Sequence, residues 1–91
     1  MTVNVTAEHI TAGKACNCDK CPIALALQEM NPGTLVSVMD DYVRFYRTGV
    51  IENCGLPKEA AAFVDHFDHD DPEMRSLAVP FTFVLSDWSY R

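Results

Sequence analysis

Hydrophobic residues recur along the chain with two periods, and each period predicts a different kind of element. Apolar and polar residues alternate in several short runs, which is typical of half-buried strands. These runs predict strands over residues 2–6, 35–39, 42–47 and 81–85, with a further short strand over 50–51. Asp40 and Asp41 alone separate two of the runs, and a two-residue connection predicts a β-hairpin.

Two other segments carry apolar residues at helical spacing. The first is expected to begin near Cys21, with Pro22 at the first helical position and Asp19 or Cys21 as the cap. Its predicted buried stripe consists of Ile23, Ala24, Leu27 and Met30, and Asn31-Pro32-Gly33 is expected to end it. The second begins at Pro57, carries the stripe Ala60, Phe63, Val64 and Phe67, and ends at Asp70-Asp71-Pro72.

The remaining segments are predicted to be irregular. Residues 7–10 are expected to continue the first strand or to begin a turn, 11–20 to form a loop, and 73–79 to be a linker. Residues 1–91 are therefore expected to form a single α+β domain. Its predicted core is a small antiparallel or mixed sheet of four to five strands with two short helices packed on it.

Charge narrows the range of partners. The chain has a formal net charge of −6, which disfavours direct binding to nucleic acid or to an anionic membrane. It contains no apolar run of membrane-spanning length, and its first residues lack the pattern of a secretory signal. We therefore expect a cytoplasmic protein without a membrane partner.

Three of the four cysteines lie close together in the predicted loop. Cys18 and Cys21 have the C-x-x-C spacing with which two thiolates can bind one metal ion. Cys16, Cys54 and His9 could complete a tetrahedral site, which makes one structural zinc ion a candidate cofactor. The alternatives are a set of reduced structural cysteines, a disulfide, or a thiol redox site in which the helix start lowers the pKa of Cys21.

Acidic residues concentrate in and after the second predicted helix, where no Lys or Arg interrupts them. Six of the thirteen acids lie there: Glu59, Asp65, Asp68, Asp70, Asp71 and Glu73. This segment is either a solvated helix end or a docking surface for a basic partner, and Trp88 and Tyr90 could add aromatic contact area to it. His66 and His69 could instead bind a metal ion together with a neighbouring Asp.

Several short motifs occur in a characteristic order along the chain. They are Thr6-Ala-Glu-His9-Ile10-Thr-Ala-Gly13, Cys21-Pro22-Ile-Ala-Leu-Ala-Leu27, Leu56-Pro57-Lys-Glu-Ala60, Phe63-Val-Asp-His-Phe67-Asp and Pro80-Phe-Thr-Phe83. Taken together they resemble small proteins encoded by actinobacterial phages and prophages. The resemblance covers most of the chain and implies an accessory protein that acts on a protein of the host cell. It assigns no role to any residue.

These observations favour a non-enzymatic protein that binds and modulates or inhibits a host protein. One form of this hypothesis is an anti-defence protein whose acidic surface imitates DNA phosphates and occupies a nucleic-acid-binding host protein. The alternatives are a small zinc-stabilised module and a thiol redox protein.

Overall fold

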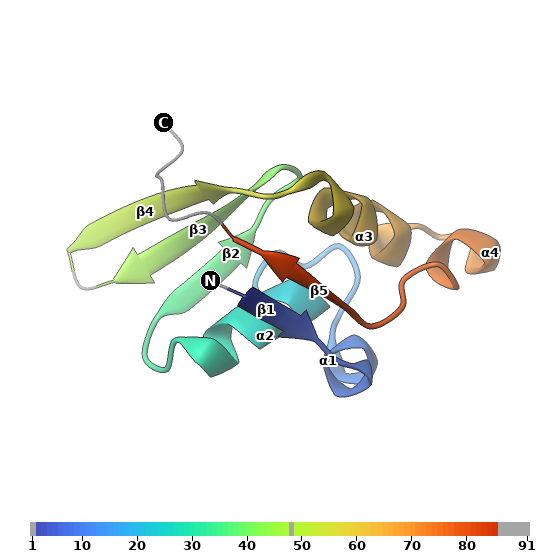
Figure 1. Ribbon diagram of the computed structural model, residues 1–91, viewed down its shortest axis with the longest axis horizontal. Coiled ribbons are helices and arrows are strands. Elements are labelled where there is room, and N and C mark those ends of the chain that lie inside the picture. The colour runs from blue at the N-terminus through green and yellow to red at the C-terminus, as the bar shows by residue number, and fades with distance from the viewer. Residues whose placement is uncertain (1, 48, 86–91) are drawn as a thin grey trace.

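A computed structural model describes residues 2–47 and 49–85 of the chain (Figure 1). Helices and strands alternate irregularly along the chain. In order they are β1 (Thr2–Val5), α1 (Ala7–Ala12), α2 (Pro22–Met30), β2 (Leu35–Val38), β3 (Tyr42–Arg47), β4 (Val50–Gly55), α3 (Lys58–Asp68), α4 (Pro72–Arg75) and β5 (Phe81–Val84). The predicted α+β class is confirmed.

The five strands form two separate antiparallel sheets, whereas we expected one sheet. The first and last strands, β1 and β5, pair with each other, and β2, β3 and β4 form a meander. The predicted hairpin at Asp40-Asp41 is confirmed, because the Met39 N–H donates a 2.8 Å hydrogen bond to the carbonyl of Tyr42 across it. Helix α2 packs against β1 of one sheet and β2 of the other, so it joins the two sheets (Figure 1).

Helix α2 begins where the sequence predicted. Cys21 is its N-cap, and the Cys21 Sγ accepts a 3.4 Å hydrogen bond from the Ala24 N–H. Ile23 and Leu27 are fully buried, as expected from the stripe. The prediction for Met30 was wrong: it is 45% exposed, because it is the last residue of the helix and the chain turns away at Asn31.

Helix α1 was not predicted, since we expected residues 7–10 to be strand or turn. A capping box starts this helix: the Thr6 Oγ1 accepts from the His9 N–H at 3.3 Å, and the His9 Nδ1 accepts from the Thr6 N–H at 3.0 Å. Glu or Gln usually occupies the position that His9 takes here, so the motif was missed. Gly13 ends the helix so close to Pro22 that a Cβ on Gly13 would lie 2.7 Å from the Pro22 Cδ.

Aromatic rings join α3 to the sheet formed by β1 and β5. Phe63 and Phe67 are buried in the predicted stripe, and the Phe63 ring stacks on Phe81 at a centroid distance of 4.8 Å. After α3, the segment predicted to be a linker contains the short helix α4, which Asp71 caps by accepting a 3.0 Å hydrogen bond from the Glu73 N–H. The strand predicted over 50–51 is longer and continues as β4 to Gly55.

Candidate functional site

Two hydrogen bonds hold the loop that carries Cys16 and Cys18 against the rest of the fold. The Cys16 N–H donates a 2.9 Å hydrogen bond to the Asp68 carboxylate at the end of α3, and the Val38 N–H of β2 donates a 2.8 Å bond to the Cys18 carbonyl. The backbone φ of Cys16 is 56°, in the left-handed region that residues with a Cβ seldom adopt. The two hydrogen bonds therefore hold a strained backbone conformation. We call residues 14–20 the cysteine loop.

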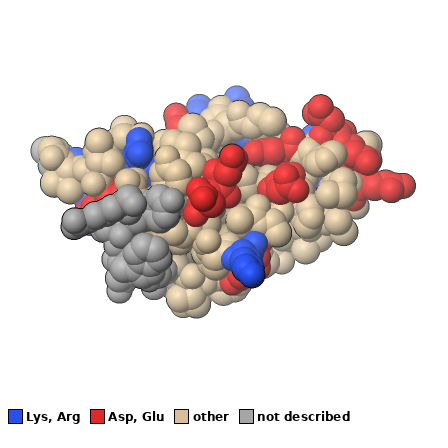
Figure 2. Space-filling view, turned by 90° about the horizontal axis from the view of Figure 1, so that it is seen from above, with Lys and Arg blue, Asp and Glu red and all other residues tan. Residues whose placement is uncertain are grey.

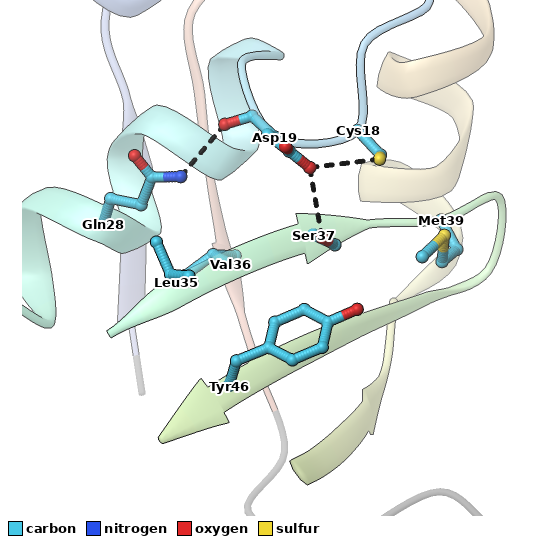
Figure 3. Close-up of a pocket in the computed structure, with 8 residues that line it drawn as sticks. All are labelled: Cys18, Asp19, Gln28, Leu35, Val36, Ser37, Met39 and Tyr46. Carbon is cyan, nitrogen blue, oxygen red and sulfur yellow. Dashed lines mark hydrogen bonds between the residues drawn. The ribbon is translucent and has the colours of Figure 1, made fainter. Parts of the chain in front are cut away.

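A hollow of about 390 Å³ lies between the cysteine loop, α2 and β2, and Figure 3 labels the residues that line it. The Asp19 Oδ1 accepts 3.2 Å hydrogen bonds from the Ser37 hydroxyl and from the Cys18 thiol. The Gln28 side-chain amide donates a 3.0 Å bond to the Asp19 carbonyl. These contacts fix the Asp19 carboxylate at the rim of the hollow, and we call the space the Asp19 hollow.

A second hollow, of about 300 Å³, lies between the cysteine loop, the β2–β3 turn and α3. Cys18 and Met39 line both hollows, so the two adjoin. The second hollow adds the carboxylates of Asp40 and Asp68, and among the described residues no Lys, Arg or His lines either hollow. We call the two together the cysteine-loop groove. The charged side chains described along this groove are therefore all acidic.

The two cysteines with altered pKa values are both poor nucleophiles at neutral pH. The pKa of Cys18 is raised, chiefly because its thiol donates a hydrogen bond to the Asp19 carboxylate and also because of burial. Burial raises the pKa of Cys21 to about 11. The direction is the opposite of the one that thiol redox chemistry requires.

The five predicted zinc ligands are only partly brought together. Cys16, Cys18 and Cys21 line the second hollow, but Cys54 is buried in β4 opposite Val43, outside the lining of both hollows. His9 lies on α1, where its Nε2 contacts the Glu29 carboxylate at 2.9 Å. Within residues 2–47 and 49–85, no three His, Cys, Asp or Glu side chains are placed to hold one metal ion. Zinc binding therefore stays a prediction.

The acidic segment forms one end of the molecule, over α3 and α4 (Figure 2). We call Glu59, Asp65, Asp68, Asp70, Asp71 and Glu73 the acidic end. Asp68 and Asp71 have structural roles, since they bond the Cys16 N–H and cap α4. Among the described residues, Glu59, Asp65, Asp70 and Glu73 have no ion-pair partner.

Among the described residues, the basic side chains near the acidic end form no ion pair with it. The Arg75 guanidinium lies over the Phe67 ring, 5.3 Å from its centroid. The His69 Nδ1 accepts a 3.3 Å bond from the Asp71 N–H, and His66 lines a shallow, mostly apolar hollow together with Phe63. Trp88 and Tyr90, the predicted aromatic part of the surface, lie outside the described residues.

Sequence reasoning identified the cysteines and Asp68 but missed Asp19, Gln28, Ser37, Asp40 and Tyr46 as parts of one site. Asp19 and Ser37 are far apart in the sequence, and the bond between them follows from the docking of the cysteine loop on β2. The alternation in β2 gave no signal for this contact, because it places Ser37 on the polar face, whereas Ser37 is buried in the structure like Val36 and Val38.

No helix in the described part of the chain has both the length and the apolar character needed to cross a membrane. Comparison of the chain with known protein families, with curated proteins and with solved structures found no match.

Proposed function

We propose that the chain is a non-enzymatic binding protein that docks onto a basic surface of a protein partner. The acidic end provides the main contact surface, and the cysteine-loop groove extends it, with Asp68 belonging to both. The observation that carries the proposal is that acidic side chains gather at one end of the molecule without basic partners among the described residues.

Among the described residues, no ion pair offsets the repulsion between the gathered acids, although Asp68 and Asp71 make structural hydrogen bonds. Asp65 lies in the last turn of α3, where the helix dipole disfavours a negative charge. Like charges placed close together also repel one another, and salt screens such exposed charges over roughly 10 Å at 0.1 M. A basic partner would remove both penalties on binding, so complementary charge supports a docking role.

The resemblance to phage and prophage proteins supports a host protein as the partner. A nucleic-acid-binding host protein presents a basic surface of the required sign. In the anti-defence form of the proposal, the acidic end occupies the surface on which such a protein holds DNA phosphates, and the partner is thereby inhibited.

Affinity capture tests the proposal. Tagged wild-type chain is compared with Asp65→Asn/Asp70→Asn in a bacterial lysate at rising salt, and bound proteins are identified by mass spectrometry. The control, Glu8→Gln/Glu29→Gln, removes the same charge from exposed positions of α1 and α2. We expect a basic protein that wild type and control retain and that the Asp65/Asp70 variant releases at lower salt. Equal retention by all three chains would contradict the proposal.

A zinc-stabilised module is the second candidate, because Cys16, Cys18 and Cys21 line one hollow. Zinc binding would require the cysteine loop to rearrange, since its side chains are not placed as a ligand set. Metal analysis of protein purified without added metal, together with thiol titration, tests this candidate. Stoichiometric zinc with protected thiols would support it, and freely titrating thiols without zinc would remove it.

A further inference from the structure

The Asp19 hollow has the chemistry of a receptor for one positively charged side chain. Among the described residues, the Asp19 carboxylate receives side-chain hydrogen bonds from two neutral groups, the Ser37 hydroxyl and the Cys18 thiol. Such donors orient a carboxylate but leave its charge in place. Within residues 2–47 and 49–85, no Lys, Arg or His forms an ion pair with Asp19. A cation is therefore the complementary ligand.

The hollow also contains hydrogen-bond acceptors besides the Asp19 carboxylate. The Gln28 amide nitrogen donates one of its two N–H groups to the Asp19 carbonyl at 3.0 Å, so this side chain keeps one N–H donor and its acceptor oxygen. A ligand that carries several N–H groups, such as a guanidinium or an ammonium, can donate to the Asp19 carboxylate and has further donors for other acceptors of the hollow. Among the described residues that line the hollow, an anionic ligand would meet a carboxylate and no Lys, Arg or His.

The apolar part of the lining suits the stem of such a side chain. Leu35 and Tyr46 are cross-strand neighbours on β2 and β3, and Leu35 is 70% exposed in the free chain. In Figure 3 the Tyr46 ring lies beside β2 near Ser37. An aromatic ring attracts a cation through its face, and methylene groups gain from contact with Leu35.

The volume of the Asp19 hollow and its contact with the second hollow favour a peptide segment as the source of the cation. The volume of the hollow, about 390 Å³, exceeds that of one side chain. The hollow also adjoins the second hollow, which contains Asp40 and Asp68. A peptide segment with two basic residues could therefore place one in each hollow, whereas a small free amine could use only one of them.

We propose that the Asp19 hollow binds an arginine or lysine side chain of the protein partner, and that the second hollow receives a neighbouring basic residue. This inference rests on the proposed function, because it specifies how the basic partner engages the groove. It differs from that proposal in a testable respect, since it requires a shaped pocket and not only a charged surface.

A titration followed by amide chemical shifts tests the inference without the partner. The probe is the blocked peptide acetyl-Gly-Arg-Gly-Arg-Gly-amide, and its control replaces both arginines by citrulline, which has nearly the same shape without the charge. We expect saturable shifts at Asp19, Gln28, Leu35 and Tyr46 with the arginine peptide, and binding at least about tenfold weaker for the citrulline peptide. Equal binding of both peptides, or arginine-dependent shifts at other residues only, would overturn the inference.

Variants of the hollow provide the second part of the test. Asp19→Asn keeps the Oδ1 acceptor for Ser37 and Cys18 and removes the charge, so the fold is retained. We expect it to weaken the arginine peptide about tenfold, and Tyr46→Leu to weaken it several-fold, while Glu8→Gln leaves it unchanged. Unchanged binding by Asp19→Asn would overturn the inference.

Two further arms separate the possible failures. If spermidine binds the hollow as tightly as the arginine peptide, the ligand is a free polyamine and the assignment to a partner side chain is wrong. If Asp19→Asn has no effect on partner capture while Asp65→Asn/Asp70→Asn reduces it, the pocket inference fails and the docking proposal stands. If neither variant changes capture, the docking proposal fails as well.

Discussion

The thiol of Cys21 makes the stability of the fold depend on pH in the alkaline range. This side chain is 5% exposed and caps α2, and burial raises its pKa from 9.0 to about 11. In the unfolded chain the thiol is in water, where it ionises near its ordinary pKa. The folded chain therefore keeps the proton after the unfolded chain has lost it.

The sign and the size of the effect follow from this difference. Below about pH 9 both states are protonated and the contribution of Cys21 to stability is fully present. Between about pH 9 and about pH 11 only the unfolded state ionises, so the free energy of unfolding falls as the pH rises. A difference of about 2 pKa units corresponds to a loss of roughly 3 kcal/mol at most.

Urea unfolding between about pH 8 and about pH 11 measures this loss. The test variant is Cys21→Ser, because serine can cap the helix but does not ionise in this range. The control is Cys16→Ser, which removes an exposed thiol and leaves Cys21 in place. We expect wild type and control to lose up to roughly 3 kcal/mol more than Cys21→Ser over this range. Identical pH profiles for all three chains would refute the reasoning.

Three further predictions concern the helix ends, the packing of Gly13 and the exposed thiols. Asp65→Lys in the last turn of α3 should raise the free energy of unfolding by about 0.5–1 kcal/mol at low salt. Glu59→Lys in the first turn of the same helix should lower it. A destabilised Asp65→Lys together with a stabilised Glu59→Lys would contradict the dipole argument. Gly13→Ala should cost about 1–3 kcal/mol in urea unfolding, because its Cβ would lie 2.7 Å from the Pro22 Cδ; an unchanged midpoint would show that this contact relaxes freely. Iodoacetamide should modify Cys16 and, more slowly because of its raised pKa, Cys18 in the folded chain, and the two buried cysteines only after unfolding, as read by mass spectrometry. Equal labelling of all four in the folded state would contradict the burial.

Local signals in the sequence were sufficient for most of the secondary structure. Pro22 after Cys21 marked the start of α2, and the stripe with Phe63 and Phe67 marked the buried face of α3. These predictions succeeded because each depends on residues within two helical turns. The sequence did not predict helix α1, because the start of this helix depends on His9 at a position where the usual capping-box residue is Glu or Gln.

The groove could not be predicted in the same way. It forms where Cys16 reaches Asp68 and Cys18 reaches Val38, and both contacts join parts of the chain that are distant in the sequence. Residues such as Asp19 and Ser37 have no local pattern that shows they meet. The acidic end, in contrast, was visible in the sequence because its residues are close together along the chain.

Hydrogen exchange, measured on the chain bound to the basic protein that it captures, shows whether the acidic end and the cysteine loop form the docking surface. The account predicts that binding slows exchange in residues 59–73 and in the cysteine loop, while exchange in the part of β3 and β4 near Val50 stays unchanged. Protection confined to that end of β3 and β4, with free exchange at the acidic end, would contradict it.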